Sequence, residues 1–214
     1  MPTYSLAEQE FRFKTKILPV VVLTHVDQAV PLAHALLEGG IDAIEITLRH
    51  ASAIKCIEKI ARDCPEICVG AGTVTRPQEV AQVKSAGAQF ALSPGLTEAV
   101  HEAVCGQAFP FIPGVFTPSE VIRAREYGYQ VHKLFPAAQA GGVGMLKALA
   151  GPLADVKLCP TGGVSAQNLS EFLAQPNVAM VGGTWIAPAQ LIETKQWNEI
   201  TALSKQACEI ARSA

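Results

Sequence analysis

The sequence has little of what marks several large classes of protein. Only 17% of its 214 residues are charged, and the formal net charge of −2 includes no block of like charges. The longest early apolar run, 17–23, contains Pro19 and is soon followed by His25 and Asp27, so it is too short for a membrane span. The residues before it lack the basic-then-apolar order of a signal peptide. We therefore expect a soluble protein that binds small molecules, with no nucleic acid and no membrane as partners.

The six cysteines show neither the paired spacing of a disulfide framework nor a CxxC motif. Cys64 and Cys68 come nearest to a metal or redox motif, and no histidine stands at a zinc-finger interval from them. Unpaired thiols are typical of proteins in a reducing compartment. We expect reduced cysteines, a cytoplasmic location and no bound metal.

Apolar runs alternate with helical segments along most of the chain, and 49% of the residues are hydrophobic, enough for a large core. The pattern predicts eight strands, at residues 18–23, 43–47, 67–70, 89–92, 109–112, 130–134, 156–159 and 178–181. It predicts helices near residues 27–38, 51–62, 76–86, 97–105, 117–127, 142–150, 166–174 and 196–211.

The predicted strands recur about every 21 to 25 residues, which is the length of a βα unit in a parallel sheet. Eight such units predict an α/β protein with a (β/α)8 TIM barrel, formed as a single domain by residues 1–214. Residues 1–16 are predicted to form a short N-terminal helix outside the repeat. The alternative is a doubly wound open sheet, although no GxGxxG motif opens a helix after the first strand.

One predicted strand carries a lysine among apolar residues. In the stretch 129–136, Lys133 shares a strand face with Val131 and Phe135. Burial disfavours the charged form of an amine, and the neutral amine is a nucleophile that forms Schiff bases with carbonyl compounds. The plainer alternative is a lysine at the end of a strand whose amine reaches solvent.

The alternation of side chains also places a glutamate and an arginine of the second predicted strand. Ile44 and Ile46 form the face expected to meet the helices, so Glu45 and Arg49 point into the barrel. A buried carboxylate holds its proton more readily and suits a proton shuttle. The alternative is a purely structural pairing of Glu45 with Lys133 or Arg49.

Glycine pairs follow the last two predicted strands. Gly162 and Gly163 follow the seventh strand, and the turn 182–184 follows the eighth. Backbone N–H groups approach an anion closely where no Cβ intervenes, and in this fold the loops after strands seven and eight are the usual phosphate site. We interpret the two turns as a phosphate cradle, with ordinary tight turns as the alternative.

Two other strand ends supply candidates. Thr73 follows the third strand, where its hydroxyl could bind a carboxylate oxygen or cap the helix that starts near Arg76 and Pro77. Pro94 lies in the turn after the fourth strand and could line the wall of a pocket.

Together these strand ends resemble the signature segments of the bacterial 2-keto-3-deoxy-6-phosphogluconate (KDPG) aldolase family, whose members also cleave 4-hydroxy-2-oxoglutarate (KHG). The resemblance runs from about residue 17 to about residue 190. Its segments are EITLR at 45–49, VGAGTV at 69–74, SPG at 93–95, IPG at 112–114, KLFPA at 133–137, CPTGG at 159–163 and GGTW at 182–185.

The resemblance implies a class I (Schiff-base) aldolase of the Entner–Doudoroff pathway. The expected products are pyruvate and D-glyceraldehyde 3-phosphate, or pyruvate and glyoxylate from KHG. It implies that Lys133 forms the Schiff base, that Glu45 shuttles protons, and that Arg49 and Thr73 hold the carboxylate of the keto acid. It also implies that no metal or other cofactor is needed and that the enzyme is a homotrimer.

The remaining implied contacts lie at the cavity wall and at the phosphate. Pro94 and Phe135 would pack against the pyruvyl group, while Gly162, Gly163 and Thr184 would bind the phosphate. Position 184 is commonly serine in the family, and Thr184 keeps the hydroxyl while adding a methyl group.

Two other functions are compatible with the same fold. A phosphosugar isomerase or epimerase would depend on metal, and would need His and Asp ligands converging at the mouth of the barrel. The histidines do not offer that set, because His132 faces away from Lys133 while His34 and His101 lie within predicted helices. A non-catalytic barrel that binds phosphometabolites is the second alternative.

Overall fold

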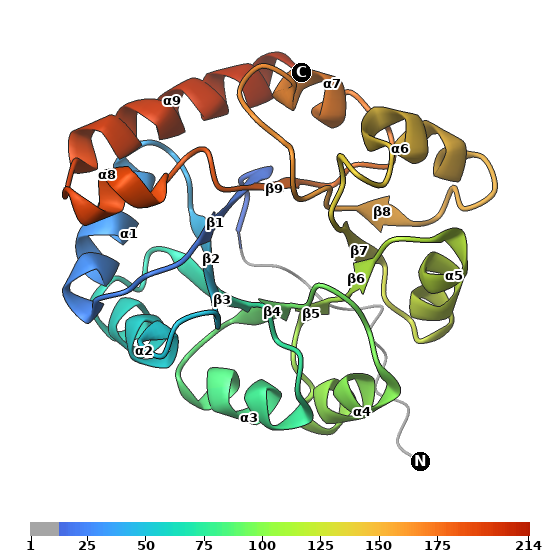
Figure 1. Ribbon diagram of the computed structural model, residues 1–214, viewed down its shortest axis with the longest axis horizontal. Coiled ribbons are helices and arrows are strands. Elements are labelled where there is room, and N and C mark those ends of the chain that lie inside the picture. The colour runs from blue at the N-terminus through green and yellow to red at the C-terminus, as the bar shows by residue number, and fades with distance from the viewer. Residues whose placement is uncertain (1–12) are drawn as a thin grey trace.

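The computed structural model describes residues 13–214 and shows strands arranged in a ring inside a layer of helices (Figure 1). The strands are β1 (Ile17–Val21), β2 (Ala43–Thr47), β3 (Cys68–Gly72), β4 (Phe90–Leu92), β5 (Phe111–Ile112), β6 (Gly114–Val115), β7 (Val131–Leu134), β8 (Lys157–Leu158) and β9 (Val181–Gly183). The helices are the 3₁₀ turn η2 (Val26–Gln28), α1 (Ala29–Glu38), α2 (Ala53–Asp63), α3 (Pro77–Ser85), α4 (Glu98–Gln107), α5 (Pro118–Glu126), α6 (Gly142–Ala150), α7 (Leu169–Leu173), α8 (Ala189–Glu193) and α9 (Trp197–Ser213).

Local sequence accounts for where these helices begin and which face they bury. In α2 the buried side chains follow helical spacing, so one stripe packs inward and the charged residues face outward. At the start of α5, the Thr117 hydroxyl accepts a hydrogen bond from the N–H of Glu120. The Glu120 carboxylate in turn accepts one from the N–H of Thr117, at 2.7 Å. The capping box expected from the sequence at this helix is confirmed.

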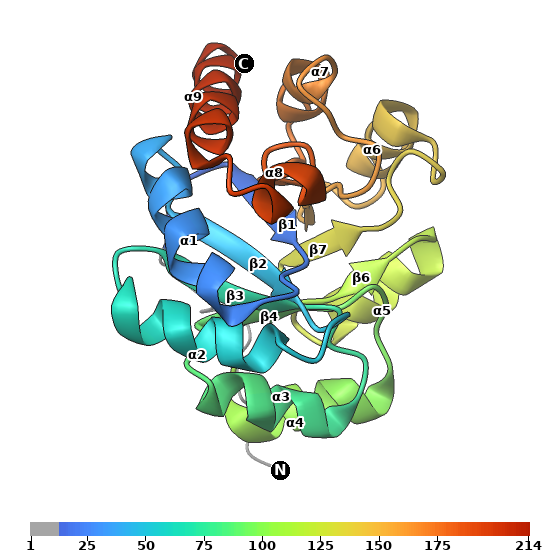
Figure 2. The ribbon, with the colours of Figure 1, turned by 60° about the vertical axis from the view of Figure 1, so that its left-hand side comes forward.

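Every strand pairing is parallel, which confirms the predicted α/β class. The described strands form two sheets, one with six strands in the order β5-β4-β3-β2-β1-β9 and one with the order β6-β7-β8. Isolated bridges at Leu158–Val178 and Thr161–Gly182 lie between the β8 segment and the β9 segment. The helices surround the strands in both views (Figures 1 and 2). A single continuous eight-stranded sheet is not observed in residues 13–214.

The two sheets separate at Pro113. The strand predicted at residues 109–112 is instead a pair of short strands, β5 and β6, with this proline between them. Proline has no N–H to donate to a neighbouring strand, which interrupts the ladder. The N–H of Gly114 donates instead to the buried hydroxyl of Ser93, at 3.2 Å. The carbonyl of Pro113 still accepts from the N–H of Lys133, at 2.8 Å, so β7 remains anchored at the break.

Two apolar clusters fill the molecule, one on each side of the strands. The larger cluster includes Ile44 and Ile46 and packs between strands and helices. The smaller includes Ala43 and Phe90, and the ring of Phe13 packs on Phe90 with centroids 5.2 Å apart. The predicted alternation of faces along β2 is therefore confirmed.

Other parts of the chain also differ from the prediction, and the strand predicted at residues 178–181 lies at Val181–Gly183. Of the N-terminal helix predicted at residues 1–16, residues 1–12 lie outside the described range, and residues 13–16 are not helical. There the N–H groups of Lys14 and Thr15 donate to the Asp42 carboxylate, at 2.8 and 3.0 Å. The short helix α8 was not predicted. None of the helices in residues 13–214 has both the length and the apolar character that a membrane span requires.

Candidate active site

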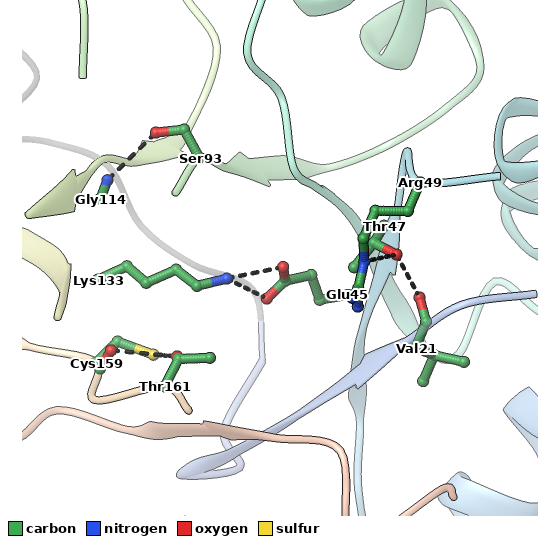
Figure 3. Close-up of polar contacts among 9 residues, drawn as sticks. All are labelled: Val21, Glu45, Thr47, Arg49, Ser93, Gly114, Lys133, Cys159 and Thr161. Carbon is green, nitrogen blue, oxygen red and sulfur yellow. Dashed lines mark hydrogen bonds and ion pairs between the residues drawn. The ribbon is translucent and has the colours of Figure 1, made fainter. Parts of the chain in front are cut away.

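A buried ion pair connects β7 with β2. The Nζ of Lys133 lies 2.9 Å from Oε1 and 3.3 Å from Oε2 of Glu45. Figure 3 shows the two side chains extending toward each other from opposite sides of the interior. Lys133 is 5% exposed and Glu45 is fully buried. The predicted inward orientation of both side chains is confirmed, and the solvent-facing alternative for Lys133 is wrong.

The surroundings of this pair are mostly apolar. The Nζ of Lys133 lies 5.5 Å from the ring centroid of Phe135, a distance at which a cation is attracted to an aromatic face. Burial raises the pKa of the Cys159 thiol to about 12, an effect that the nearby positive charge of Lys133 only partly opposes. The thiol therefore stays neutral near the ion pair.

The ion pair lies at the inner end of a cavity of about 350 Å³. The nine residues singled out from the sequence all line this cavity, and the strands bring them together from six separate segments of the chain. They are Glu45, Arg49, Thr73, Pro94, Lys133, Phe135, Gly162, Gly163 and Thr184.

The side chain of Arg49 is held at one nitrogen. Its Nε donates to the hydroxyl of Thr47 at 3.2 Å, and that hydroxyl donates to the carbonyl of Val21 at 3.1 Å (Figure 3). The anchoring leaves the two terminal nitrogens of the guanidinium for a further partner, and a guanidinium binds a carboxylate through two parallel hydrogen bonds.

Thr73 has a left-handed backbone, with φ of 62°. Such a conformation is unusual for a β-branched residue and costs on the order of 1–3 kcal/mol. Thr73 does not cap the next helix: the N-cap of α3 is Arg76, whose N–H donates to the Glu79 carboxylate at 3.0 Å. The capping alternative considered for Thr73 is therefore wrong, and Thr73 lies in the cavity wall.

The turn after β8 exposes main-chain donors. Gly162 and Gly163 have φ of 94° and 84°, a region that favours glycine. A Cβ on Gly163 would lie 2.4 Å from the Cβ of Ala138, so a side chain there would also collide with its neighbour. Within residues 13–214, the N–H groups of these two glycines donate to no protein acceptor. They can therefore bind an anion in the cavity.

Other cavity residues were not singled out as site residues from the sequence. They are Val20, Thr47, Thr161 and Val164, while Gly183, which also lines the cavity, belongs to the turn 182–184 already assigned to the phosphate cradle. Thr161 could have been predicted as a site residue, because it carries a hydroxyl group and directly precedes the Gly-Gly turn at the end of a predicted strand. Val20 gave no such signal, because an inward valine in a strand is indistinguishable from a core residue.

His132 lies next to Lys133 in the sequence but on the opposite face of β7. Its Nε2 donates to the carbonyl of Tyr129 at 2.9 Å, and its Nδ1 has no partner among the described residues. Burial lowers the pKa of His132. The histidine is therefore a neutral core residue, as its predicted orientation implied. No cluster of three or more His, Cys, Asp or Glu side chains that could hold a metal ion occurs in residues 13–214.

Comparisons with known proteins agree with this geometry. The model of the family described as KDPG and KHG aldolase matches residues 9–203. The KHG/KDPG aldolase of Escherichia coli K12 is 45% identical over 196 residues, 92% of each chain. The 2-dehydro-3-deoxy-phosphogluconate aldolase of Dickeya dadantii is 42% identical over 207 residues, 97% of each chain.

The crystal structure of the Legionella pneumophila KDPG aldolase has a TM-score of 0.89 at 42% identity, and the match covers 97% of this chain and 98% of that one. That structure holds pyruvate as a covalent carbinolamine intermediate. The chain belongs to the KDPG and KHG aldolase family.

Proposed function

We propose that this protein is a class I aldolase that cleaves 2-dehydro-3-deoxy-6-phosphogluconate to pyruvate and D-glyceraldehyde 3-phosphate. It also cleaves 4-hydroxy-2-oxoglutarate to pyruvate and glyoxylate. The observation that carries the proposal is the buried contact between the Lys133 amine and the Glu45 carboxylate at the inner end of the cavity. Family membership favours this function over the isomerase and the non-catalytic barrel.

Formation of the Schiff base begins with this contact. Transfer of one proton from the Lys133 ammonium to Glu45 gives a neutral amine and a neutral acid side by side. The amine attacks the C2 carbonyl of the keto acid, and the new C–N bond gives a carbinolamine. Glu45 returns a proton to the departing hydroxyl, water leaves, and the iminium forms.

The iminium accepts the electrons of the bond that breaks. Glu45, directly or through a water, takes the proton of the C4 hydroxyl as the C3–C4 bond cleaves, which releases the aldehyde and leaves an enamine on Lys133. Protonation of the enamine at C3 and hydrolysis of the iminium then give pyruvate and the free amine. Because the lysine imine serves as the electron sink, this chemistry needs no metal and no other cofactor.

The other lining residues bind the ends of the substrate. Arg49 and Thr73 hold the carboxylate next to the carbonyl carbon, and the anchored guanidinium supports this role for Arg49. Pro94 and Phe135 pack against the pyruvyl group. The phosphate binds at the far end, where the N–H groups of Gly162 and Gly163 and the hydroxyl of Thr184 line the cavity.

Borohydride reduction in the presence of pyruvate tests the proposal directly. Reduction of the iminium fixes a pyruvyl group on the lysine, and peptide mass analysis locates it. We expect the adduct on Lys133, and none in a Lys133→Arg variant that keeps the positive charge. An adduct on another lysine, or on none, would contradict the proposal. A strong increase of activity on adding a divalent metal would favour the isomerase instead.

The assembly and location of the enzyme belong to the same proposal. The two sheets together form one closed (β/α)8 barrel in this proposal, which is supported by the bridge Thr161–Gly182 between the β8 and β9 segments. We propose a homotrimer from family membership, and two large apolar side chains that are 40% and 43% exposed, Phe116 just before α5 and Ile122 within it, support contact between copies of the chain. Light scattering should give about three times the 22.6 kDa chain mass. In residues 13–214 no disulfide bond joins any of the six cysteines, which supports a cytoplasmic location.

A further inference from the structure

We infer that Gly72 is a positioning residue for the reaction: the space left by its missing side chain is the space that the Glu45 carboxylate occupies. The inference rests on the proposed proton-shuttle role of Glu45. It concerns how that carboxylate is held, and it names a residue that contacts no substrate.

The contact is close. Gly72 is the last residue of β3 and pairs in register with Thr47 of β2. A Cβ built on Gly72 would lie 2.0 Å from Oε1 of Glu45 and 2.6 Å from both its Cδ and its Cγ. Real Cβ atoms do not approach other heavy atoms so closely. An alanine at this position would therefore force the carboxylate to move.

Backbone conformation is not the reason for the glycine. The non-glycine Thr73 and the pair Gly162 and Gly163 have positive φ, but Gly72 does not. An alanine could adopt the backbone of Gly72 without strain. The three atoms that its Cβ would meet first all belong to the side chain of Glu45.

The packing contact matters because Glu45 has few polar partners. In residues 13–214 its carboxylate accepts hydrogen bonds from Lys133 alone. Once Lys133 has become an imine, its nitrogen carries one proton in place of three, and this attraction weakens. The space beside Gly72 is still present at that stage, so the carboxylate can keep the position from which we expect it to reach C3 and C4.

Gly70 supplies a matched control on the same strand. A side chain placed on Gly70 would point to the same interior face as one placed on Gly72, because residues two apart on a strand share a face. A Cβ on Gly70 would lie 2.3 Å from Cζ of Phe90, which belongs to the apolar cluster and not to the cavity lining. Gly70 pairs in register with Glu45, but the three atoms nearest to its Cβ position all belong to Phe90, so alanine there first displaces the Phe90 ring and not the Glu45 carboxylate.

A double-mutant cycle between Gly72→Ala and Glu45→Ala tests the inference. Alanine at position 45 removes the Cγ, Cδ and Oε1 atoms that the new methyl group would meet, whereas aspartate would keep a carboxyl carbon at the place of the Cγ, 2.6 Å from it. With glutamate at position 45, we expect Gly72→Ala to lower kcat at least about 100-fold, since general acid–base groups contribute about 10²- to 10⁴-fold. With alanine at that position, we expect Gly72→Ala to lower the residual kcat less than about fivefold. Such coupling is the signature of a direct contact.

The controls separate positioning from general damage. Gly70→Ala should lower kcat by the same factor in both backgrounds, and Gly144→Ala, which meets no atom within 4 Å, should change nothing. The KM for pyruvate, measured by borohydride trapping, should stay within about threefold in Gly72→Ala because Arg49 and Thr73 are not displaced.

Equal losses from Gly72→Ala in both backgrounds would overturn the inference. If the single variant does not fold, the comparison of Glu45→Ala with Glu45→Ala/Gly72→Ala still decides: equal kcat values support the contact, and a further loss above about tenfold contradicts it. A full wild-type rate for Glu45→Ala alone would instead count against the proton-shuttle role of Glu45, which is a separate failure.

Discussion

Lys133 and Glu45 are 88 positions apart in the sequence, and their charged groups lie 2.9 Å apart in the interior. A buried ammonium or a buried carboxylate is costly without a partner. Each residue therefore makes the burial of the other tolerable. The same contact places a proton acceptor beside the amine that must lose its proton before it can attack a carbonyl.

Removal of one charge should destabilise the fold unless the other is removed too. We expect Lys133→Met to lower the free energy of unfolding by about 3–5 kcal/mol, because it leaves the Glu45 carboxylate buried without a partner. The double variant Lys133→Met/Glu45→Gln should recover most of this loss. Urea unfolding at pH 7 measures both values, and equal stabilities of the single and double variants would show that the pair is not coupled.

Glu45→Gln should impair proton transfer while keeping the shape of the side chain. We expect kcat to fall about 10²- to 10⁴-fold, with slower trapping of pyruvate by borohydride. The exposed Glu38→Gln serves as the charge-matched control, with activity unchanged. A Glu45→Gln enzyme within twofold of the wild type would assign proton transfer to another group.

Arg49→Lys should weaken binding of the keto-acid carboxylate. Lysine keeps the charge but cannot both anchor on the Thr47 hydroxyl and offer two parallel donors. We expect the KM for pyruvate, in exchange of its methyl protons with solvent, to rise about 10-fold or more, since one lost charge-assisted hydrogen bond is worth about 1.5–3 kcal/mol. An unchanged KM would place the carboxylate elsewhere.

Gly163→Ala should discriminate between the phosphorylated and unphosphorylated substrates. The positive φ and the contact with Ala138 both oppose a side chain, so the turn and its N–H donors should shift. We expect KM for the phosphorylated sugar acid to rise about 10-fold or more, while KM for 4-hydroxy-2-oxoglutarate changes less than about twofold. Thr184→Ser should affect only the phosphorylated substrate. Equal effects on both substrates would argue against a phosphate site at this turn.

His132 should make stability depend on pH near neutrality. Burial holds its pKa below the ordinary value of 6.5, so the unfolded chain binds a proton more readily than the folded one. The stability that the folded state gains from His132 is therefore complete above about pH 6.5 and is lost as the pH falls toward the folded-state pKa of this residue. We expect the free energy of unfolding to decrease less between pH 7 and pH 5 in His132→Gln than in the wild type. Parallel curves from urea titrations would show that His132 does not contribute.

The orientation of the catalytic pair could be predicted because it follows from a simple rule. Side chains alternate along a strand, so the apolar neighbours of Lys133 and Glu45 fix which face each occupies. The regular βα repeat then brings the carboxyl ends of the strands to one side of the molecule. Those two steps were enough to group residues from six segments around one cavity.

Other features depend on distances between side chains, which no local pattern contains. The contact between Gly72 and Glu45 requires knowledge of the rotamer of Glu45 and of the spacing of β2 and β3. Likewise, the left-handed backbone of Thr73 contradicts the usual preference of a β-branched residue. The break between the sheets at Pro113 could have been predicted, because proline interrupts the hydrogen bonds between strands. The hydrogen bond from the N–H of Gly114 to the Ser93 hydroxyl could not.

Phe13 and Phe90 belong to the apolar cluster that fills the interior near the amino ends of the strands, whereas the cavity residues lie at or after the carboxyl ends. We therefore expect substrate and products to enter and leave at the carboxyl-end side. In the proposed reaction the aldehyde fragment would lie on the outer side of the covalently held three-carbon unit. We then expect the aldehyde to depart first and pyruvate second, which makes the order of product departure fixed.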